Sequence, residues 1–329
     1  MEHELIWGLP VIGYLFLAGL GAGALVTSTS LLLRGKNSPD YFRLARYGAI
    51  LSIPTVAVGT ALLVLELGSF QSGHWLRWIN LYKVINLSPM SLGSWFLILY
   101  FAVAAPYVYT FLVPNSHSQD RFASLRRVLA YPCIALGIGV AVYTGILLGA
   151  MPARPLWNSP ILALLFLISA ISTGIASVII SDWIAVKIGS AKWCAEHLGR
   201  DRERGSSGTT NAEYTLAATD TIFIGFEVLV IGLYFMYAHL AVGDVRMSIK
   251  VFELGGALSG YFWVGVVLFG LTIPVILETR KILPRLLGSG PYVHSGAMVV
   301  VVPLMVIMGG FLLRYVIVVG GQIAKLAGI

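Results

Sequence analysis

The chain has 329 residues, of which 57% are apolar or aromatic and only 11% are charged. A soluble domain carries about 25% charged residues, and with fewer than half as many it would expose an aliphatic surface that aggregates. The composition therefore excludes a soluble enzyme, a disordered chain and a secreted disulfide scaffold, and it indicates a membrane protein that crosses the bilayer several times.

Eight stretches of the sequence are long and apolar enough to cross a membrane. A hydrocarbon core about 30 Å thick needs roughly 20 helical residues. The stretches lack the alternation of barrel strands, so we expect an all-α integral membrane protein that forms one domain over residues 1–329. The expected helices cover about residues 8–33, 46–66, 92–113, 127–149, 158–186, 214–240, 258–281 and 293–317.

The basic residues predict the orientation of this bundle. Fifteen of the 22 Lys and Arg residues fall in the connections after the first, third, fifth and seventh helices. By the positive-inside rule, both termini face the periplasmic or outer side, and residues 187–211 form a cytoplasmic linker between the first five helices and the last three. The net charge of +7 therefore reflects topology rather than nucleic-acid binding.

Polar side chains from distant parts of the sequence are expected at one depth near the outer face. An ionisable side chain within a span costs about 2.5–3.5 kcal/mol on insertion scales, so it marks a candidate functional site. A quinone head group needs hydrogen-bond partners for two carbonyls, a group that exchanges protons and an aromatic or apolar wall. The candidate quinone-binding residues are Tyr14, Glu66, Ser88, Ser91 and Trp95, and the candidate catalytic residues are Glu66, His239 and Arg314.

Each of these residues also has a structural explanation. Glu66 and Arg314 could form an ion pair between helices, and Trp95 could belong to the aromatic belt of the membrane interface. Tyr14 could bond a neighbouring carbonyl, and His239 could be an interfacial side chain. The grouping of all of them at one depth is what favours a binding site.

Four acidic residues are expected deeper in the bundle. Asp220 and Glu227 are seven residues apart, which is two helical turns or about 10.5 Å, so they share one helix face. Asp182 and Glu278 lie near the inner ends of their helices. The four could line a proton path from the inner face; the alternative is that Asp182 and Glu278 reach the interface and only Glu227 is buried.

Metal cofactors are not expected in this chain. Two cysteines, Cys133 and Cys194, are too few for a cysteine-ligated zinc or iron–sulfur site. A membrane haem needs two facing imidazoles, whereas only His74 and His239 share a side and neither lies well within a span. Electrons would therefore reach an organic acceptor from outside the chain.

Several motifs make the sequence resemble the NrfD/PsrC family, the membrane subunits of polysulfide-reductase-like complexes. The most specific is Ser88-Pro89-Met90-Ser91 followed by Gly93-Ser94-Trp95, and the resemblance extends over essentially the whole chain. The motifs are Trp7-Gly8-Leu9-Pro10 with residues 14–23, then residues 63–68, 86–95, 155–160 and Arg314-Tyr315.

The resemblance implies an eight-helix, haem-free subunit in the inner (cytoplasmic) membrane of a bacterium or archaeon, with menaquinone or ubiquinone bound near the outer face. It implies an extracytoplasmic ferredoxin-like partner with [4Fe–4S] clusters and a catalytic partner, often one with molybdopterin. Glu66 matches the family's acidic residue after the second helix, and Tyr14 stands where some relatives have a histidine.

The expected function is that of a quinone-reactive anchor subunit of a respiratory oxidoreductase, with or without proton translocation. A quinol would give electrons to the partner's cluster while Glu66, with His239, accepts protons. Arg314 would orient Glu66, and Trp95 with Ser91 would border the ring. Electron flow in the reverse direction, from the partner to a quinone, would use the same residues.

Two other functions stay open from the sequence. An ion-coupled secondary transporter would use Asp220 and Glu227 as coupling carboxylates, and an inert anchor would only hold an extracytoplasmic enzyme. Residues 70–85 are expected to form an amphipathic interfacial helix that contacts lipid and the partner.

Overall fold

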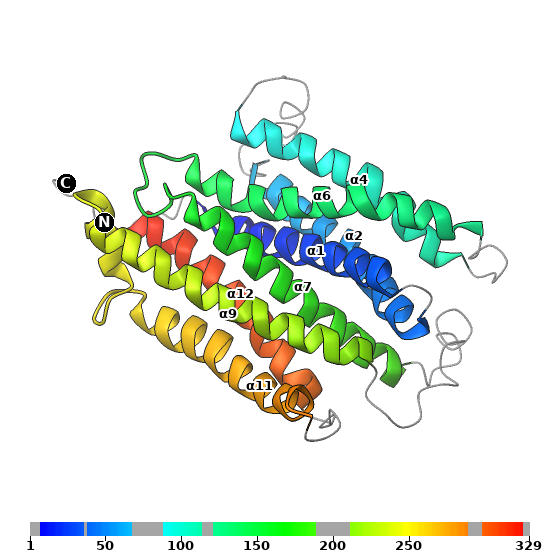
Figure 1. Ribbon diagram of the computed structural model, residues 1–329. Helices are drawn as coiled ribbons and strands as arrows, with labels where there is room; N and C mark the ends of the chain where they lie inside the picture. The colour runs from blue at the N-terminus through cyan, green and yellow to red at the C-terminus, as the bar shows by residue number, and fades with distance from the viewer. Residues whose placement is uncertain are drawn as a thin grey trace.

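The computed structural model contains eight helices long and apolar enough to span a membrane within the part of the chain that it describes. The helices lie side by side with their axes roughly aligned (Figure 1). The expected docking helix at 70–85 and most of the expected linker at 187–211 lie outside the described residues. The described residues are 7–35, 38–67, 88–113, 121–188, 211–288 and 298–324.

The eight spans follow the sequence order expected from the apolar stretches. The seventh span consists of a π-helical segment, η5, that continues directly as α11. Two short helices, α10 and η4, precede it. The helices are α1 (Leu9–Arg34), α2 (Pro39–Leu67), α4 (Pro89–Leu112), α6 (Ala123–Gly149), α7 (Ile161–Ile188), α9 (Asn211–Leu240), α10 (Asp244–Ser248), η4 (Ile249–Val251), η5 (Tyr261–Thr272), α11 (Ile273–Leu286) and α12 (Met298–Ile323).

Several helix ends differ from the expected ones. The helix α2 begins at Pro39 rather than at 46, because Arg43 and Arg46 belong to helical turns that extend past the apolar stretch. The helix α4 begins at Pro89 rather than at 92, since the hydroxyl of Ser88 caps it by accepting a bond from the Ser91 amide. The helix α12 (Met298–Ile323) ends at 323 rather than at 317, and residues 293–297, where it was expected to begin, lie outside the described residues. Charge and hydropathy thus predict where a span lies more accurately than they predict the residues at which it begins and ends.

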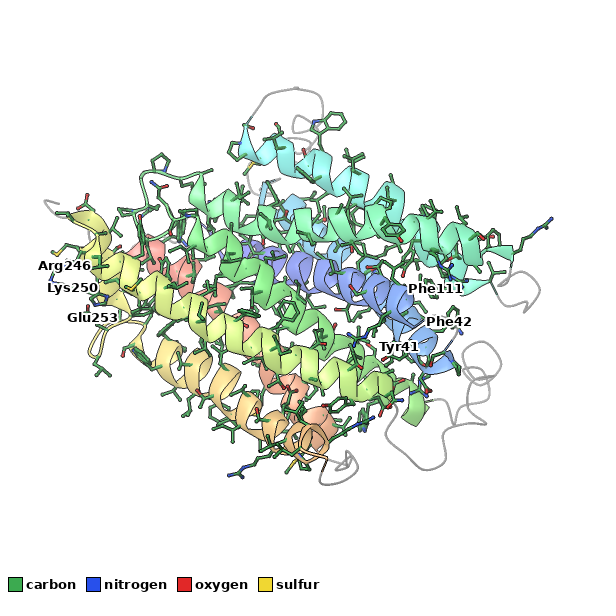
Figure 2. The ribbon with its side chains drawn as sticks, in the orientation of Figure 1. Tyr41, Phe42, Phe111, Arg246, Lys250 and Glu253 are labelled. Carbon is green, nitrogen blue, oxygen red and sulfur yellow. The ribbon has the colours of Figure 1, made fainter. Side chains whose placement is uncertain are left out.

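The first and last described parts of the chain lie at the same end of the bundle. The backbone amide of Trp7 donates to Gln322 Oε1 at 2.9 Å, and Gln322 Nε2 donates to the Trp7 carbonyl at 3.1 Å. We call this the Trp7 end and the opposite one the Asp182 end. Figure 2 shows Arg246, Lys250 and Glu253 at the Trp7 end, far from the ring pair of Phe42 and Phe111.

The helices α1 and α7 form the centre of the bundle. In Figure 1 they lie between a group containing α4 and α6 and a group containing α9, α11 and α12, and α1 packs against α2, α6, α7 and α12. The backbones of α1 and α7 touch, because a Cβ added to Gly23 would lie 1.8 Å from the Ala170 carbonyl oxygen and one added to Gly174 would lie 2.3 Å from the Gly23 carbonyl carbon. Small residues allow this approach, which strengthens packing in lipid.

A second close approach joins the seventh and eighth spans. A Cβ added to Gly270 on η5 would lie 2.6 Å from the Gly309 Cα on α12. The wide π-helical turns of η5 end at Thr272, whose hydroxyl donates to the Val267 carbonyl at 2.7 Å, five residues back. Segments of this kind are uncommon and are often near functional sites.

Substituting Gly23 by Ala is expected to destabilise the protein by about 1–3 kcal/mol, because the added methyl group forces α1 and α7 apart. The matched control is Gly225→Ala on α9, where nothing lies within 4 Å of the added Cβ. Alanine there should leave stability unchanged or raise it by up to about 1 kcal/mol through helix propensity. Thermal unfolding of the purified protein in detergent measures both, and equal midpoints for Gly23→Ala and wild type would contradict the close contact.

Candidate functional site

Glu66 lies at the Trp7 end of α2, beside the beginning of α1. Its side chain is exposed, and its Oε1 is 3.6 Å from the position that a Cβ on Gly8 would take. The indole of Trp7 stacks on Trp157 with ring centroids 5.1 Å apart, and Trp157 Nε1 donates to the Ile317 carbonyl at 2.8 Å. The beginning of α1, the connection before α7 and the end of α12 are therefore fixed together next to this carboxylate.

The remaining candidate quinone-binding residues are near the same end but point in different directions. Tyr14 is buried two turns into α1. Ser88 donates to Ser91 Oγ at 3.2 Å, and Ser91 is buried where α4 packs against its neighbours. Trp95 is 41% exposed, so its indole lies on the outside of α4. This placement of Trp95 agrees with the aromatic-belt alternative.

Arg314 is fully buried near the centre of the bundle. Its guanidinium donates to the backbone carbonyls of Leu15 at 3.3 Å, Gly310 at 2.8 Å and Phe166 at 3.5 Å, and to the hydroxyl of Ser169 at 3.0 Å. These partners belong to α1, α12 and α7. The planar group with five donors suits such a set of acceptors, and the charge holds three helices together.

The acidic side chain that acts on Arg314 is Glu227 of α9, rather than Glu66. Glu227 is buried and its charge interacts with that of Arg314, which also donates to the Ser169 hydroxyl. None of the hydrogen bonds of Arg314 among the described residues reaches Glu66. In place of the alternative Glu66–Arg314 ion pair, the charge of Arg314 therefore interacts with that of Glu227.

A second buried group joins α7, α9 and α11. Ser172 donates to Asp220 Oδ1 at 2.7 Å, and Thr221 donates to Glu278 Oε2 at 2.9 Å. The exposed fraction is 0% for Asp220 and 5% for Glu278, and the charges of the two carboxyl groups interact. One alternative from the sequence was that only Glu227 is buried. The structure shows that Asp220 and Glu278 are buried as well.

Asp182 lies apart from the other three acidic residues, at the end of the bundle named after it. Its Oδ1 is 3.1 Å from Arg43 Nε, and Arg43 Nη2 is 3.4 Å from Glu213 Oε1. Arg126 nearby donates to the Thr110 carbonyl at 2.6 Å. This end is therefore rich in ion pairs and partly open to solvent.

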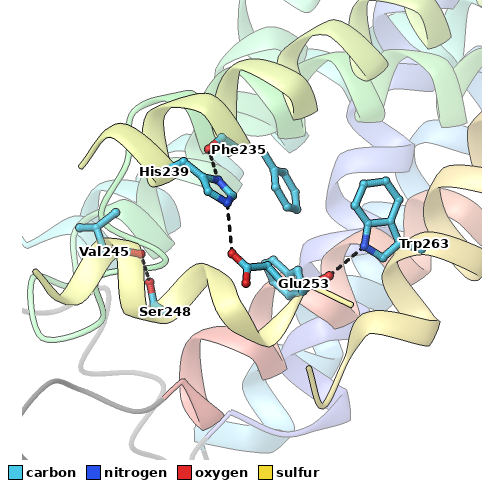
Figure 3. A network of polar contacts seen from close by, with 7 residues as sticks. Phe235, His239, Val245, Ser248, Glu253 and Trp263 are labelled. Carbon is cyan, nitrogen blue, oxygen red and sulfur yellow. Dashed lines mark hydrogen bonds and ion pairs between the residues drawn. The ribbon is translucent and has the colours of Figure 1, made fainter. Parts of the chain in front are cut away.

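His239 is exposed at the Trp7 end of α9 (Figure 3). Its Nδ1 is 2.9 Å from the Phe235 carbonyl and its Nε2 is 3.1 Å from Glu253 Oε1, both within hydrogen-bonding distance. The segment that presents Glu253 is held by Trp263, whose indole donates to the Phe252 carbonyl at 2.9 Å. The bonds of His239 therefore reach α9 and the segment after η4, not α1 or α2.

The sequence reasoning missed the hydroxyl groups that link the buried charges. Ser169 and Ser172 are three residues apart on α7 and bond to partners from other helices, as Thr221 does on α9. The spacing of Ser169 and Ser172 on one helix face was visible in the sequence. Serine and threonine in spans commonly bond their own helix, as Thr173 does to the Ser169 carbonyl, so the spacing alone did not identify the link.

A family model described as "Polysulphide reductase, NrfD" matches residues 1–193 and 202–326. The chain belongs to the NrfD family. One of the chains of polysulfide reductase from Wolinella succinogenes is 29% identical, with 97% of this chain and 95% of that protein covered. Protein NrfD of Escherichia coli (strain K12) is 28% identical, with 84% and 85% covered. One of the subunits of selenate reductase from Mesobacillus selenatarsenatis is 23% identical, with 97% and 74% covered.

The described part of this NrfD-family chain contains no group of three or more His, Cys, Asp and Glu residues that could hold a metal ion. Its buried polar side chains are carboxyl, hydroxyl and guanidinium groups. Such groups bind protons and polar head groups.

Replacing Arg314 by Lys is expected to destabilise this NrfD-family protein by about 1.5–3 kcal/mol. A lysine keeps the charge but loses the fork of donors that reaches α1 and α7 at once. The control is Arg246→Lys at an exposed position of α10, which should have no measurable effect. Thermal unfolding in detergent distinguishes them, and equal stability of the two variants would show that the guanidinium bonds contribute little.

Proposed function

We propose that this chain is the quinone-reactive membrane subunit of a multi-subunit respiratory oxidoreductase. The observation on which the proposal rests is the family match over nearly the whole chain, together with relatives named as parts of a polysulfide reductase and a selenate reductase. The subunit exchanges electrons between a menaquinone or ubiquinone pool and an iron–sulfur subunit. It is not the subunit that converts the terminal substrate.

The proposed quinone site is at the Trp7 end, around Glu66. This end has few basic residues, so by the positive-inside rule it faces the periplasm of a bacterial or archaeal inner membrane. The absence of a side chain at Gly8 leaves Glu66 accessible beside α1. Tyr14 and the hydroxyls of Ser88 and Ser91 supply further hydrogen-bonding groups within the same end of the bundle.

Oxidation of a quinol releases two electrons and two protons. The electrons pass to the iron–sulfur cluster of the partner, and the protons need acceptors at the site. Glu66 is the proposed first acceptor, because an exposed carboxylate at a helix end both accepts a proton and returns it to water. His239 is the proposed second acceptor at this end. In the reverse direction the same groups deliver protons to a quinone.

Arg314 has a positioning role in this proposal. It bonds the Leu15 carbonyl, one residue after Tyr14, and so fixes the part of α1 that borders the site. Its charge acts on Glu227 in the interior. Through these two contacts Arg314 connects the region around Tyr14 with the buried acidic residues.

The buried acidic residues form the proposed proton route. Asp182 lies at the end where α2, α7 and α9 exchange ion pairs. Glu278 and Asp220 follow in the interior, and Glu227 lies two turns beyond Asp220 on α9. Three of these four side chains are buried, which is costly for a protein that does not use them.

The proposed partner surface is also at the Trp7 end. Val242 and Leu254, in the segment between α9 and η5, are 91% and 90% exposed. A ferredoxin-like subunit with [4Fe–4S] clusters, bound here, would connect to a catalytic subunit, often one that contains molybdopterin. Exposed apolar side chains of this kind are typical of the core of an interface.

A second candidate function is that of an ion-coupled secondary transporter. The burial of Asp220, Glu227 and Glu278 at mid-depth favours it, because coupling ions bind near the middle of the membrane in such proteins. Substrate uptake by liposomes that contain this chain alone would support transport. A complex that turns over quinol without such uptake supports the electron-transfer proposal.

Replacing Glu66 by Gln is expected to reduce quinol turnover of the purified complex at least tenfold, since general-base removal costs roughly 10²–10⁴ in rate when the base is essential. Assembly should be unchanged, because the side chain is exposed. The control is Asp40→Asn at the opposite end of the same helix. Turnover of Glu66→Gln equal to that of the control would remove Glu66 from the mechanism.

Purification in a mild detergent is expected to recover this chain together with an iron–sulfur subunit, which absorption and metal analysis identify. Substituting Val242 and Leu254 together by Asp should weaken that association, because two charges would be buried in an apolar contact. Substituting the exposed Tyr109 and Leu112 on α4, at the other end, by Asp is the matched control. A stable solitary chain from wild-type membranes would count against the partner.

A further inference from the structure

We infer that Asp220 and Glu278 form a carboxyl pair that holds one exchangeable proton between α9 and α11. As a station on the proton route, the pair rests on the proposed function, whereas its shared proton is a property of the pair itself. Three features support the shared proton: the burial of both groups, an unpartnered oxygen and the balance of nearby charges.

Both carboxyl groups are removed from water. Asp220 is fully buried and Glu278 nearly so. The position of Asp220, nine residues into α9, is about 13.5 Å along the helix axis from its first residue. Two negative charges close together at this depth would both lack solvation and would repel each other, which favours the binding of a proton by one of them.

The hydrogen bonds leave a fully buried oxygen of Asp220 without a donor. The Ser172 hydroxyl donates to Asp220 Oδ1. The single proton of the Thr221 hydroxyl has two acceptors within reach, Glu278 Oε2 at 2.9 Å and the Ala217 carbonyl at 3.0 Å. Asp220 Oδ2 is buried and has no hydrogen-bond partner among the described residues. A proton on this carboxyl group removes its charge, which lowers the cost of burying an oxygen that lacks a donor.

The surrounding charges compensate for one carboxylate but not for two. Lys281, one turn from Glu278 on α11 and partly exposed, acts on Glu278. Glu227 acts on Asp220 and is itself under the influence of Arg314. Within the described residues, no salt bridge joins Asp220 or Glu278 to a cation. If both carboxyl groups were ionised, the positive charge of Lys281 would compensate for only one of them. Binding of one proton neutralises the other.

The pair has a route toward the middle of the bundle. Ser172 bonds Asp220, and Ser169, three residues earlier on the same face of α7, accepts a bond from Arg314, whose charge acts on Glu227. The hydroxyls of Ser172 and Ser169 thus lie along one face of α7 between the carboxyl pair and Arg314. A proton that leaves the pair can therefore move toward Glu227 along hydroxyl groups and intervening water.

The test is infrared difference spectroscopy on the purified complex, exchanged from H2O into D2O. A protonated carboxyl group has a carbonyl stretching band that shifts on this exchange. The spectrum of the wild type minus that of the double variant Asp220→Asn, Glu278→Gln should contain this band with the intensity of one carboxyl group. The control variant Glu213→Gln, whose carboxylate is paired with Arg43, should retain the full band.

Other intensities would overturn the inference. Absence of the band means that both groups are ionised, and the intensity of two carboxyl groups means that no proton is shared. Loss of the band when sodium ions replace potassium ions at constant pH would assign the pair to a metal cation instead. These readings stand apart from quinol turnover, measured in the same preparation: a complex with the band but without turnover refutes the proposed function alone.

A second measurement needs no variant. Dicyclohexylcarbodiimide reacts with protonated carboxyl groups in apolar surroundings, and mass spectrometry of the wild-type protein locates the adduct. The expected result is modification of Asp220 or Glu278, and never of both in one molecule, since one proton serves the pair. Modification of both, or of neither, would overturn the inference.

Discussion

Each charged side chain that this bundle buries has to find its partners on another helix, because lipid offers none. Arg314 meets this constraint with carbonyl and hydroxyl oxygens from α1 and α7. Asp220 and Glu278 meet it with hydroxyls from α7 and α9. These bonds therefore determine which helices lie side by side. Glu66 is exposed and takes no part in them.

The helix α7 connects the two polar regions of the protein. Through Ser169 it contacts Arg314, which bonds α1 next to Tyr14, and through Ser172 it contacts the carboxyl pair. The close backbone contact of α7 with Gly23 keeps these hydroxyls at a fixed distance from α1. A change of charge near Tyr14 would thus act on the interior over a few rigid contacts, which is a physical basis for linking quinone chemistry to proton movement.

Much of the fold followed from the sequence, and much less of the site did. Spans are set by the length of apolar runs, a local property, so eight helices and their order were predictable. The neighbours of the site residues did not follow: Glu66 and Arg314 were placed near the same face, whereas helix packing turns Arg314 toward Glu227 and Trp95 outward. The glycines differ in the same way: Gly23 meets α7 closely, while a Cβ on Gly260 would meet nothing within 4 Å. The rotation of each helix about its axis depends on packing against residues far away in the sequence. A span that is apolar on all sides has no polar face from which this rotation could be predicted.

The central claim is that a quinone reacts at the Trp7 end of the bundle. Photolabelling of the purified complex with a radioactive azidoquinone, followed by peptide mapping, tests this most directly. The account predicts label in peptides that contain residues 7–20, 59–67 or 88–95, and competition by unlabelled quinol should abolish it. Label confined to the Asp182 end, around residues 38–46 or 121–130, would contradict the account.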